Sequence, residues 1–211
     1  IKPNNITNAY GCCCQFLSRI KPVIQNSIQK ISIIPQDSIE YQYHAILIDI
    51  YNQIEEGSDD IDISPFINNC NFENKTTISF IDLLTNVLCY YDPSVQSDLE
   101  YTSDNIFFSS ILPKSKWSFQ NSLIFDFNFL PNSDLSTSIE KEYGCISSNS
   151  KILLFRPTNQ LNFELSFHFQ MKSYKKPLML YLFAFVIAKQ DDPSHYILFF
   201  SQNSVIYTNW V

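Results

Sequence analysis

The sequence predicts an α+β fold in which a helical N-terminal half packs on a C-terminal antiparallel sheet. Two observations carry this prediction. Apolar residues recur at helical spacing as far as about residue 92, and from about residue 117 short apolar and alternating runs are typical of strands. With 211 residues and 45% apolar side chains, the chain can bury a large core. We expect one domain over residues 1–211, cut from a longer protein because the chain begins at Ile1.

Three regions of the first half are expected to be helical. Residues 11–33 have helical apolar spacing, and Pro22 should kink this region or start a second short helix. Residues 38–56 should form a helix capped by Asp37 or Ser38 and ended by Gly57, and the acidic stretch that follows should be a loop. Its expected apolar face is Ile39, Tyr43, Ile46, Leu47 and Ile50. Residues 78–91 fit a further helix, with Ile81, Leu84, Leu88 and Tyr91 in register before Pro93.

The second half is expected to consist of closely spaced strands. Residues 123–129 and 163–169 are rich in Phe and Leu, and the latter run places alternate apolar side chains on one face. The other expected strands cover residues 151–155, 180–188, 195–201 and 205–209. The last three are separated by the turn sequences KQDDPS and QNS, so they should form consecutive antiparallel strands.

Composition excludes several function classes. The net charge of −7 and the lack of a Lys/Arg run argue against direct nucleic-acid binding, and no apolar stretch is long enough to span a membrane. The six cysteines form no C-x-x-C pair, so we expect no zinc site, no other metal and no cofactor. They also form no evident disulfide framework, and the expected compartment is the reducing cytoplasm.

Three residue types needed by a thiol hydrolase occur in a suitable order. Such an enzyme needs a thiolate, preferably at a helix N-terminus, a histidine that activates it and an Asp or Asn that orients the histidine. Cysteines 12–14 near the expected start of the first helix, Ser194-His195-Tyr196 and Asn209 supply them. This order resembles the papain-like ubiquitin-specific proteases. Ser194, Val205 and Ile206 depart from that family's tail pattern, which has Gly before the histidine and then a Trp-Tyr pair.

The head of the chain can be matched to the family in two registers. The family pattern reads N-x-G-N-T-C-Y-x-N-S-x-L-Q-x-L. If Asn8 is the oxyanion-stabilising Asn, Cys13 falls on the nucleophile, but the Gly, Tyr and Gln are lost. If Tyr10 matches the family's Tyr and residues 15–17 match Q-x-L, with one residue deleted, Ala9 occupies the nucleophile position. The second register keeps more landmarks, and we prefer it.

The second register also resembles a more specific group. NNITNAYGCCCQFL and the following KPVIQN are similar to the central pseudo-hydrolase domain in the catalytic subunit of the poly(A)-nuclease deadenylation complex, which reads N-x-I-P-N-A-Y and then P-V-x-x-x-I-Q-N. The likeness continues at LIFDFNFLP and KILLF. It implies a papain-like ubiquitin-specific-protease fold with Ala9 in place of the nucleophile. The family's zinc-type cysteine pairs are absent from this chain.

The resemblance implies a scaffold that organises mRNA poly(A)-tail shortening without catalysing it. Its implied partners are the other domains of the parent deadenylase subunit and a kinase-like regulatory subunit. The alternative is an active deubiquitinase with Cys13 as nucleophile, His195 as base, Asn209 orienting the imidazole and Asn8 stabilising the oxyanion.

Two further features have structural explanations beside functional ones. Asp37 and Glu40 resemble the segment with which active family members face the basic tail of ubiquitin, although an acidic helix start stabilised by the helix dipole explains them without a ligand. His44 and His168 lie mid-helix and mid-strand without ligand-spaced neighbours, and we expect structural or surface roles for both.

Overall fold

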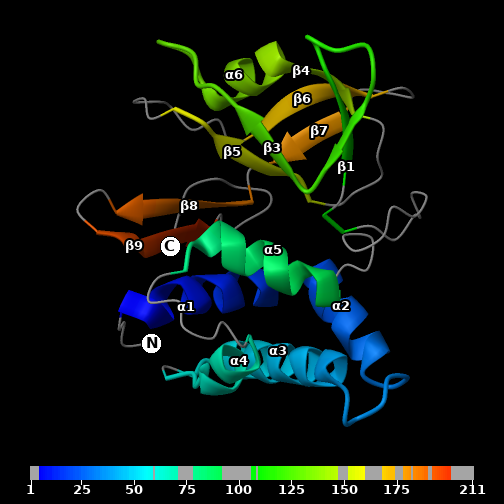
Figure 1. Ribbon diagram of the computed structural model, residues 1–211, viewed down its shortest axis with the longest axis vertical. Helices are drawn as coiled ribbons and strands as arrows, with labels where there is room; N and C mark the ends of the chain where they lie inside the picture. Colours follow the sequence, from blue (N-terminus) through cyan, green and yellow to red (C-terminus); the bar gives the residue numbers. More distant parts are fainter. Residues whose placement is uncertain are drawn as a thin grey trace. The chain divides into compact units, whose positions relative to one another are not determined.

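The computed structural model describes residues 5–58, 60–70, 78–91, 106–107, 109–146, 152–159, 168–173, 178–181, 183–189 and 192–200 (Figure 1). Two compact units divide the chain. The first contains residues 1–93 and 184–199, and the second contains residues 94–183 and 200–211. Helices dominate the N-terminal part and small sheets the C-terminal part, which confirms the α+β class. The expectation of one domain over the whole chain stays a prediction.

The first two helices are α1 (Asn5–Ser18) and α2 (Lys21–Lys30). The second short helix expected at Pro22 is confirmed, because proline fits the first helical turn, where its missing N–H has no partner to lose. The expected start of α1 at Gly11 is wrong, since the helix begins six residues earlier at Asn5. No residue between Asn5 and Gly11 is a proline, and Ala9 and Tyr10 add buried positions to the helix.

The third helix, α3 (Ile39–Glu55), has the expected ends. Ser38 is its N-cap, and Ser38 Oγ accepts the Tyr41 N–H at 3.0 Å. Gly57 follows the C-cap with φ of +74°, a left-handed conformation that glycine adopts without steric cost. The expected apolar face is confirmed at Tyr43, Leu47 and Ile50, but Ile39 is 61% exposed. Ile39 is the first residue of the helix, and its side chain lies outside the packed face that begins at Tyr43.

Two more helices complete the first unit. The short α4 (Ser64–Asn69) begins at the end of the acidic loop, where Asp62 Oδ1 accepts the Ser64 N–H, and sequence reasoning missed it. α5 (Phe80–Tyr91) confirms the expected helix, although Ile81 is only half-buried. The buried face of α5 consists of Phe80, Leu83, Leu84, Val87, Leu88 and Tyr91.

Strands β8 (Ala184–Lys189) and β9 (Asp192–Phe200) pair with each other and belong to the first unit with the helices. The single strand expected over residues 180–188 is therefore wrong. Residues 178–181 form β7 (Leu178–Tyr181), which pairs with a strand of the second unit, and the chain enters the first unit at Ala184. The apolar residues from 178 to 188 look like one strand in the sequence because they belong to two successive strands, β7 and β8.

The second unit has a mixed sheet rather than the expected antiparallel one. Its five strands, in the order β2-β1-β4-β6-β7, are β1 (Ser109–Pro113), β2 (Gln120–Ser122), β4 (Tyr143–Ile146), β6 (His168–Ser173) and β7. β4 and β6 are parallel, as are β3 (Ile124–Phe127) and β5 (Leu154–Pro157) in a separate two-stranded sheet. Parallel pairing needs a long crossover, and α6 (Leu135–Glu142) and β4 lie between β3 and β5.

Several expected strands shift or fall outside the described residues. The strand expected over residues 151–155 begins later and extends to Pro157. Of the run 163–169, only residues 168 and 169 are described, and they begin β6. The strand expected over residues 205–209 lies outside the described residues. α6 was missed, although Asp134 caps it by accepting the Thr137 N–H at 2.7 Å.

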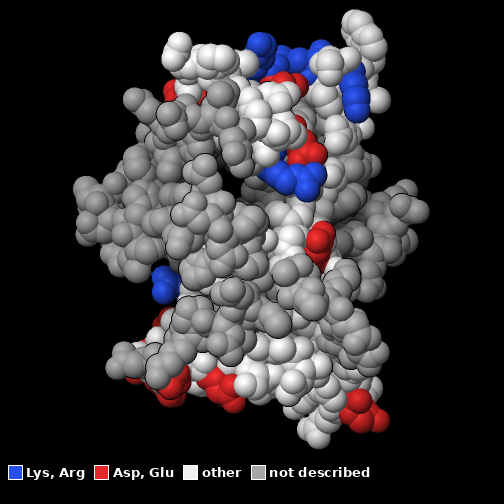
Figure 2. Space-filling view, turned by 60° about the vertical axis from the view of Figure 1, so that its left-hand side comes forward, with Lys and Arg blue, Asp and Glu red and all other residues white. Residues whose placement is uncertain are grey.

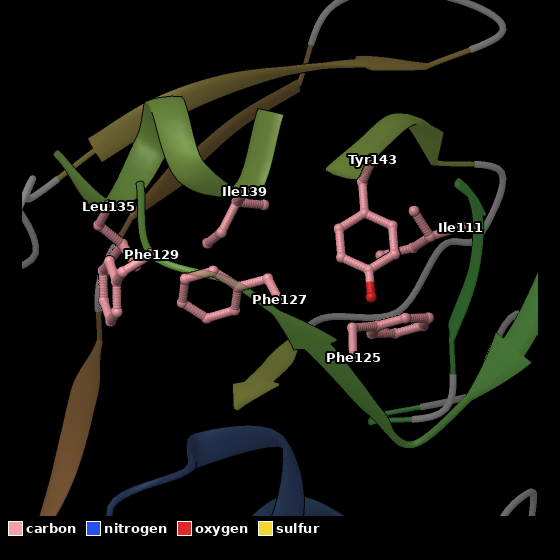
Figure 3. Close-up of a cluster of buried hydrophobic side chains, with 7 residues drawn as sticks. All are labelled: Ile111, Phe125, Phe127, Phe129, Leu135, Ile139 and Tyr143. Carbon is pink, nitrogen blue, oxygen red and sulfur yellow. The ribbon is translucent and has the colours of Figure 1, made fainter. Parts of the chain in front are cut away.

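The core of the second unit gathers around β3 (Figure 3). The strand expected over residues 123–129 is confirmed at Ile124–Phe127, where Phe125 and Phe127 are buried and Asp126 between them is exposed. Leu135 and Ile139 of α6 cover one end of this cluster and Tyr143 the other. Tyr143 also donates its hydroxyl to the Asp126 carbonyl at 2.5 Å, which ties β4 to β3. Among the described helices, none is long and apolar enough to cross a membrane.

Candidate functional site

The cysteine triplet lies in the interior of α1. Because the helix begins at Asn5, Cys12, Cys13 and Cys14 occupy its eighth to tenth positions, and the expectation that they stand near its start is wrong. The free N–H groups and the positive end of a helix dipole are confined to the first turn. The helix therefore supplies none of the electrostatic stabilisation that lowers the pKa of a catalytic thiol.

Helix α1 is attached to β9 by two hydrogen bonds at Tyr196, the residue after His195. Asn8 Oδ1 accepts the Tyr196 N–H, and Cys12 Sγ lies 3.6 Å from the Tyr196 carbonyl oxygen, to which it donates. Asn8 and Cys12 are four residues apart and so share one face of the helix. The Tyr196 ring also lies 6.1 Å from the ring of Phe80 in α5. These contacts bring the strand that carries His195 to the N-terminal half of α1.

Cys13 faces the helical core. It lies about 140° around the helix from Asn8, so the two residues do not share a face. Its side chain is 0% exposed, and burial raises its pKa well above the usual range, with further increases from the neighbouring Cys14 and Cys70. Cys13 also raises the pKa of the buried Tyr91 hydroxyl. The thiol named in the enzyme alternative is thus packed among helices and protonated at neutral pH.

Cys12 is the cysteine that contacts β9, and sequence reasoning did not single it out. The i, i+4 spacing of Asn8 and Cys12 is the signal that could have identified it. Cys12 is 7% exposed, and burial raises its pKa to about 11. Among the described residues no cation contributes to that pKa, and the thiol donates a hydrogen bond to a carbonyl oxygen. Cys12 is therefore a buried, protonated thiol that lies beside β9.

Ala9 lies beside these residues on α1. It follows Asn8 directly and precedes Cys12 by three residues, which places it about 60° from Cys12 around the helix. The side chain is 1% exposed and has no group that can donate, accept or attack. Of the other residues in the enzyme alternative, His195 lies in β9 with its side chain outside the description, and Asn209 lies outside the described residues altogether.

The remaining candidates lie apart from α1 and β9 in the sequence, in α3, in β6 and just before α3. His44 is fully buried, and its Nδ1 lies 2.9 Å from Ser27 Oγ, so the structural role expected for it is confirmed. Asp37 is exposed, whereas Glu40 Oε1 lies 3.9 Å from both Lys30 Nζ and His44 Nε2. His168 lies in β6. Within the described ranges, no three His, Cys, Asp or Glu side chains are grouped so that they could hold a metal ion.

Comparison with solved structures gives the fold. The chain is similar to the Ubp8 ubiquitin-specific protease in the SAGA Ubp8/Sgf11/Sus1/Sgf73 DUB module bound to ubiquitin aldehyde, with 13% identity and a TM-score of 0.63 over 94% of this chain and 60% of that one. A second structure of the module gives 14% identity and a TM-score of 0.61, and the match covers 95% of this chain and 58% of that one. The yeast module with a mutant Sgf73 gives 14% sequence identity and a TM-score of 0.58, and the match covers 94% of this chain and 57% of that one. This chain has a ubiquitin-specific-protease-like fold.

That fold agrees with the family resemblance of the sequence at the level of architecture. The chain spans about 60% of the length of the chains in the solved structures that it matches. No protein-family model matches the chain. A search of curated proteins found no match either.

Proposed function

We propose that this chain is a catalytically inactive ubiquitin-hydrolase-like scaffold domain of a poly(A)-specific deadenylase subunit. The observation that carries the proposal is the position of the three cysteines inside α1, where each is at most 7% exposed. A scaffold needs the fold of the hydrolase but not its thiolate. Its work is to position the parts of the parent protein, and the exonuclease itself lies outside this chain.

The pKa values of the thiols support inactivity. Thiol-dependent hydrolysis requires a thiolate near neutral pH, generated by a helix N-terminus, a cation or an adjacent histidine. Burial raises the pKa of Cys12 to about 11, and burial also raises the pKa of Cys13 well above its usual range. Ala9, which the preferred register places at the nucleophile position, is inert. Neither register thus provides a group suited to the attack.

The deadenylase assignment is supported by the sequence resemblance at residues 4–26. The proposed partners are the other domains of the parent subunit and its kinase-like regulatory subunit, and the proposed compartment is the cytoplasm. Residual ubiquitin binding at Asp37 is compatible with this role because that carboxylate is exposed. Glu40 is less available, since its carboxylate lies near Lys30 and His44.

An active deubiquitinase is the second candidate, and one contact favours it. Asn8 uses Oδ1 to hold the Tyr196 N–H, which leaves its Nδ2 to donate, as an oxyanion-stabilising amide must. One matched structure is also a DUB module bound to ubiquitin aldehyde. This enzyme would require Cys13 to leave the helical core and approach His195, with Asn209 orienting the imidazole.

Hydrolysis of a fluorogenic ubiquitin substrate separates the two candidates. We expect the chain to release no fluorophore above the buffer rate, and we expect the same of Cys13→Ala and Cys12→Ala. Cys89→Ala is the matched control, because Cys89 is a half-buried thiol on α5. Turnover that disappears in Cys13→Ala and persists in Cys89→Ala would establish the enzyme instead.

Association with a nuclease tests the scaffold role. The parent protein, tagged and purified from its own cells, should bring with it an activity that shortens a labelled oligo(A) RNA from its 3′ end and a kinase-like subunit. A chain purified without either would contradict the deadenylase assignment, whatever the outcome of the ubiquitin assay.

A further inference from the structure

The loop between β1 and β2 carries a fully exposed tryptophan. Trp117 is 104% exposed, although tryptophan is among the side chains that lose most apolar surface on folding. It makes no hydrogen bond or ring contact within the described residues. Strands β1 and β2 pair in register from Ser109–Ser122 to Ile111–Gln120, so the loop is held at its base.

The residues around Trp117 are cationic or hydroxylic. Lys114, Ser115, Lys116 and Ser118 are all exposed. Two backbone hydrogen bonds hold the loop. The Lys116 N–H donates to the Pro113 carbonyl at 3.1 Å, and the Lys114 N–H donates to the Glu142 carbonyl at 2.8 Å. The Lys114 side chain also lies over Gly144, where an added Cβ would stand 3.4 Å from Lys114 Cγ. The loop therefore presents one free aromatic face with two ammonium groups close to it in the chain.

The net negative charge of the chain does not extend to this unit. The first unit contains 13 Asp and Glu residues against 6 Lys and Arg, whereas the second contains 8 of each. The excess of −7 thus belongs to the first unit. In Figure 2 acidic side chains are visible over both units, whereas most of the visible Lys and Arg side chains lie over the second unit. Because charges beyond about 8 Å are largely screened at physiological salt, the loop can attract an anion.

We infer that the β1–β2 loop, defined as residues 113–119, binds single-stranded nucleic acid by stacking a base on Trp117 and contacting phosphates through Lys114 and Lys116. An aromatic platform beside cations is the chemistry that holds unpaired bases without sequence preference. This inference rests on the loop alone and is independent of the scaffold proposal. It modifies the expectation from net charge that the domain does not contact nucleic acid.

The surroundings of Trp117 favour a nucleic acid over the other anionic partners. An anchoring tryptophan in a protein interface is usually surrounded by further contacts that exclude water. Stable attachment to a membrane surface requires a broader apolar face. Here the four flanking positions named above are polar and exposed, so a single ring is available for stacking.

Fluorescence titration with short oligo(A) and oligo(C) RNA tests the inference. Trp210→Phe leaves Trp117 as the only tryptophan of the chain, so quenching reports contact with its indole. We expect both single strands to quench the emission and an RNA duplex of the same length to bind more weakly. In the chain without Trp210→Phe, anisotropy of labelled RNA should show that Trp117→Ala weakens binding about tenfold. Lys116→Ala should reduce the slope of log affinity against log salt by about 0.7.

Substitutions distinguish stacking from other contacts. Trp117→Phe should retain most of the affinity, whereas Trp117→Leu should resemble Trp117→Ala because leucine has no aromatic face. Tyr181→Ala, which changes an exposed aromatic residue of the same unit, and Lys21→Ala, which removes an exposed lysine of the other unit, should leave binding unchanged. An unchanged melting temperature in each variant would show that the fold is intact.

Several results would overturn the inference. These are no binding of single strands at low salt, equal binding by the chain and Trp117→Ala, or equal binding by Trp117→Leu and Trp117→Phe. Preferential binding to poly-glutamate or to phosphatidylserine vesicles that depends on Trp117 would assign the loop to an acidic protein or a membrane instead.

Discussion

At the residue scale, burial decides the chemistry of the cysteines. The sequence places three thiols together, and any of them could be a nucleophile when only residue types are considered. In the structure Cys13 and Cys14 are almost completely buried, and Cys12 donates to a backbone carbonyl. Cysteine is among the residues most often buried, and in a low-dielectric core it stays protonated. The match of Tyr10 and Gln15 to the family pattern is the sequence argument that moves the nucleophile position from the thiols to Ala9.

His44 is a second residue whose chemistry depends on burial. Its pKa is lowered by burial, with a smaller opposing effect from Glu40 and a further lowering from Lys30. The ring packs edge-on against Tyr91, and Nε2 has no hydrogen-bond partner among the described residues. Protonation would place a charge in this core. A histidine whose pKa is lower in the folded state takes up its proton more readily when the chain unfolds.

We therefore predict that stability falls with pH below the ordinary histidine pKa. The contribution of His44 should be fully present above about pH 6.5 and lost as the pH falls through the folded pKa, by at most about 1.4 kcal/mol per pH unit. Urea unfolding of the chain and of His44→Gln between about pH 7.5 and pH 5 measures how the free energy of unfolding depends on pH. The variant should have the shallower slope, and parallel slopes would show that His44 does not titrate in this range.

At the element scale, helices were easier to predict than strands. Helices α2, α3 and α5 have local signals in the chain, such as Pro22, Ser38 and Gly57, and these signals act within a few residues. Strand partners are set by contacts far apart in sequence, so the parallel pairs β3–β5 and β4–β6 could not be derived. The start of α1 could not be fixed from the sequence, because Asn5, Thr7 and Asn8 are all residue types that can cap a helix.

The N-cap of α3 gives a prediction with a matched control. Ser38→Ala removes the bond from the Tyr41 N–H and should lower the free energy of unfolding by about 1 kcal/mol. Ser32→Ala, at an exposed serine that bonds only the Gln29 carbonyl, should change it by less than about 0.5 kcal/mol. Equal losses in the two variants would show that the cap does not stabilise α3.

The attachment of β9 to α1 gives a second prediction at this scale. Asn8→Ala removes the side-chain oxygen that accepts the Tyr196 N–H. It should lower the free energy of unfolding by about 1 kcal/mol. Hydrogen exchange in a peptide covering residues 192–200 should become faster, while Gln15→Ala, at an exposed position of the same helix, should leave it unchanged. Unaltered exchange in Asn8→Ala would mean that β9 is held by other contacts.

At the scale of the whole molecule, the architecture was more predictable than the site. The change from helical to strand patterns and the resemblances at both ends indicated a ubiquitin-specific-protease-like fold, and the solved structures agree with it. The role of Cys12 was not predictable, because it depends on which face of α1 meets β9. The departures at Ser194, Val205 and Ile206 weaken the tail of the family pattern, yet β9 still forms beside α1.

The central claim is that this fold lacks a working nucleophile. Intact-mass analysis after incubation with a ubiquitin probe that carries a vinyl-type electrophile tests it most directly. We predict that the folded chain keeps its unmodified mass, because Cys12 and Cys13 are buried and protonated and Ala9 cannot react. A mass increase of one ubiquitin that disappears in Cys13→Ala or Cys12→Ala, but not in Cys89→Ala, would contradict it.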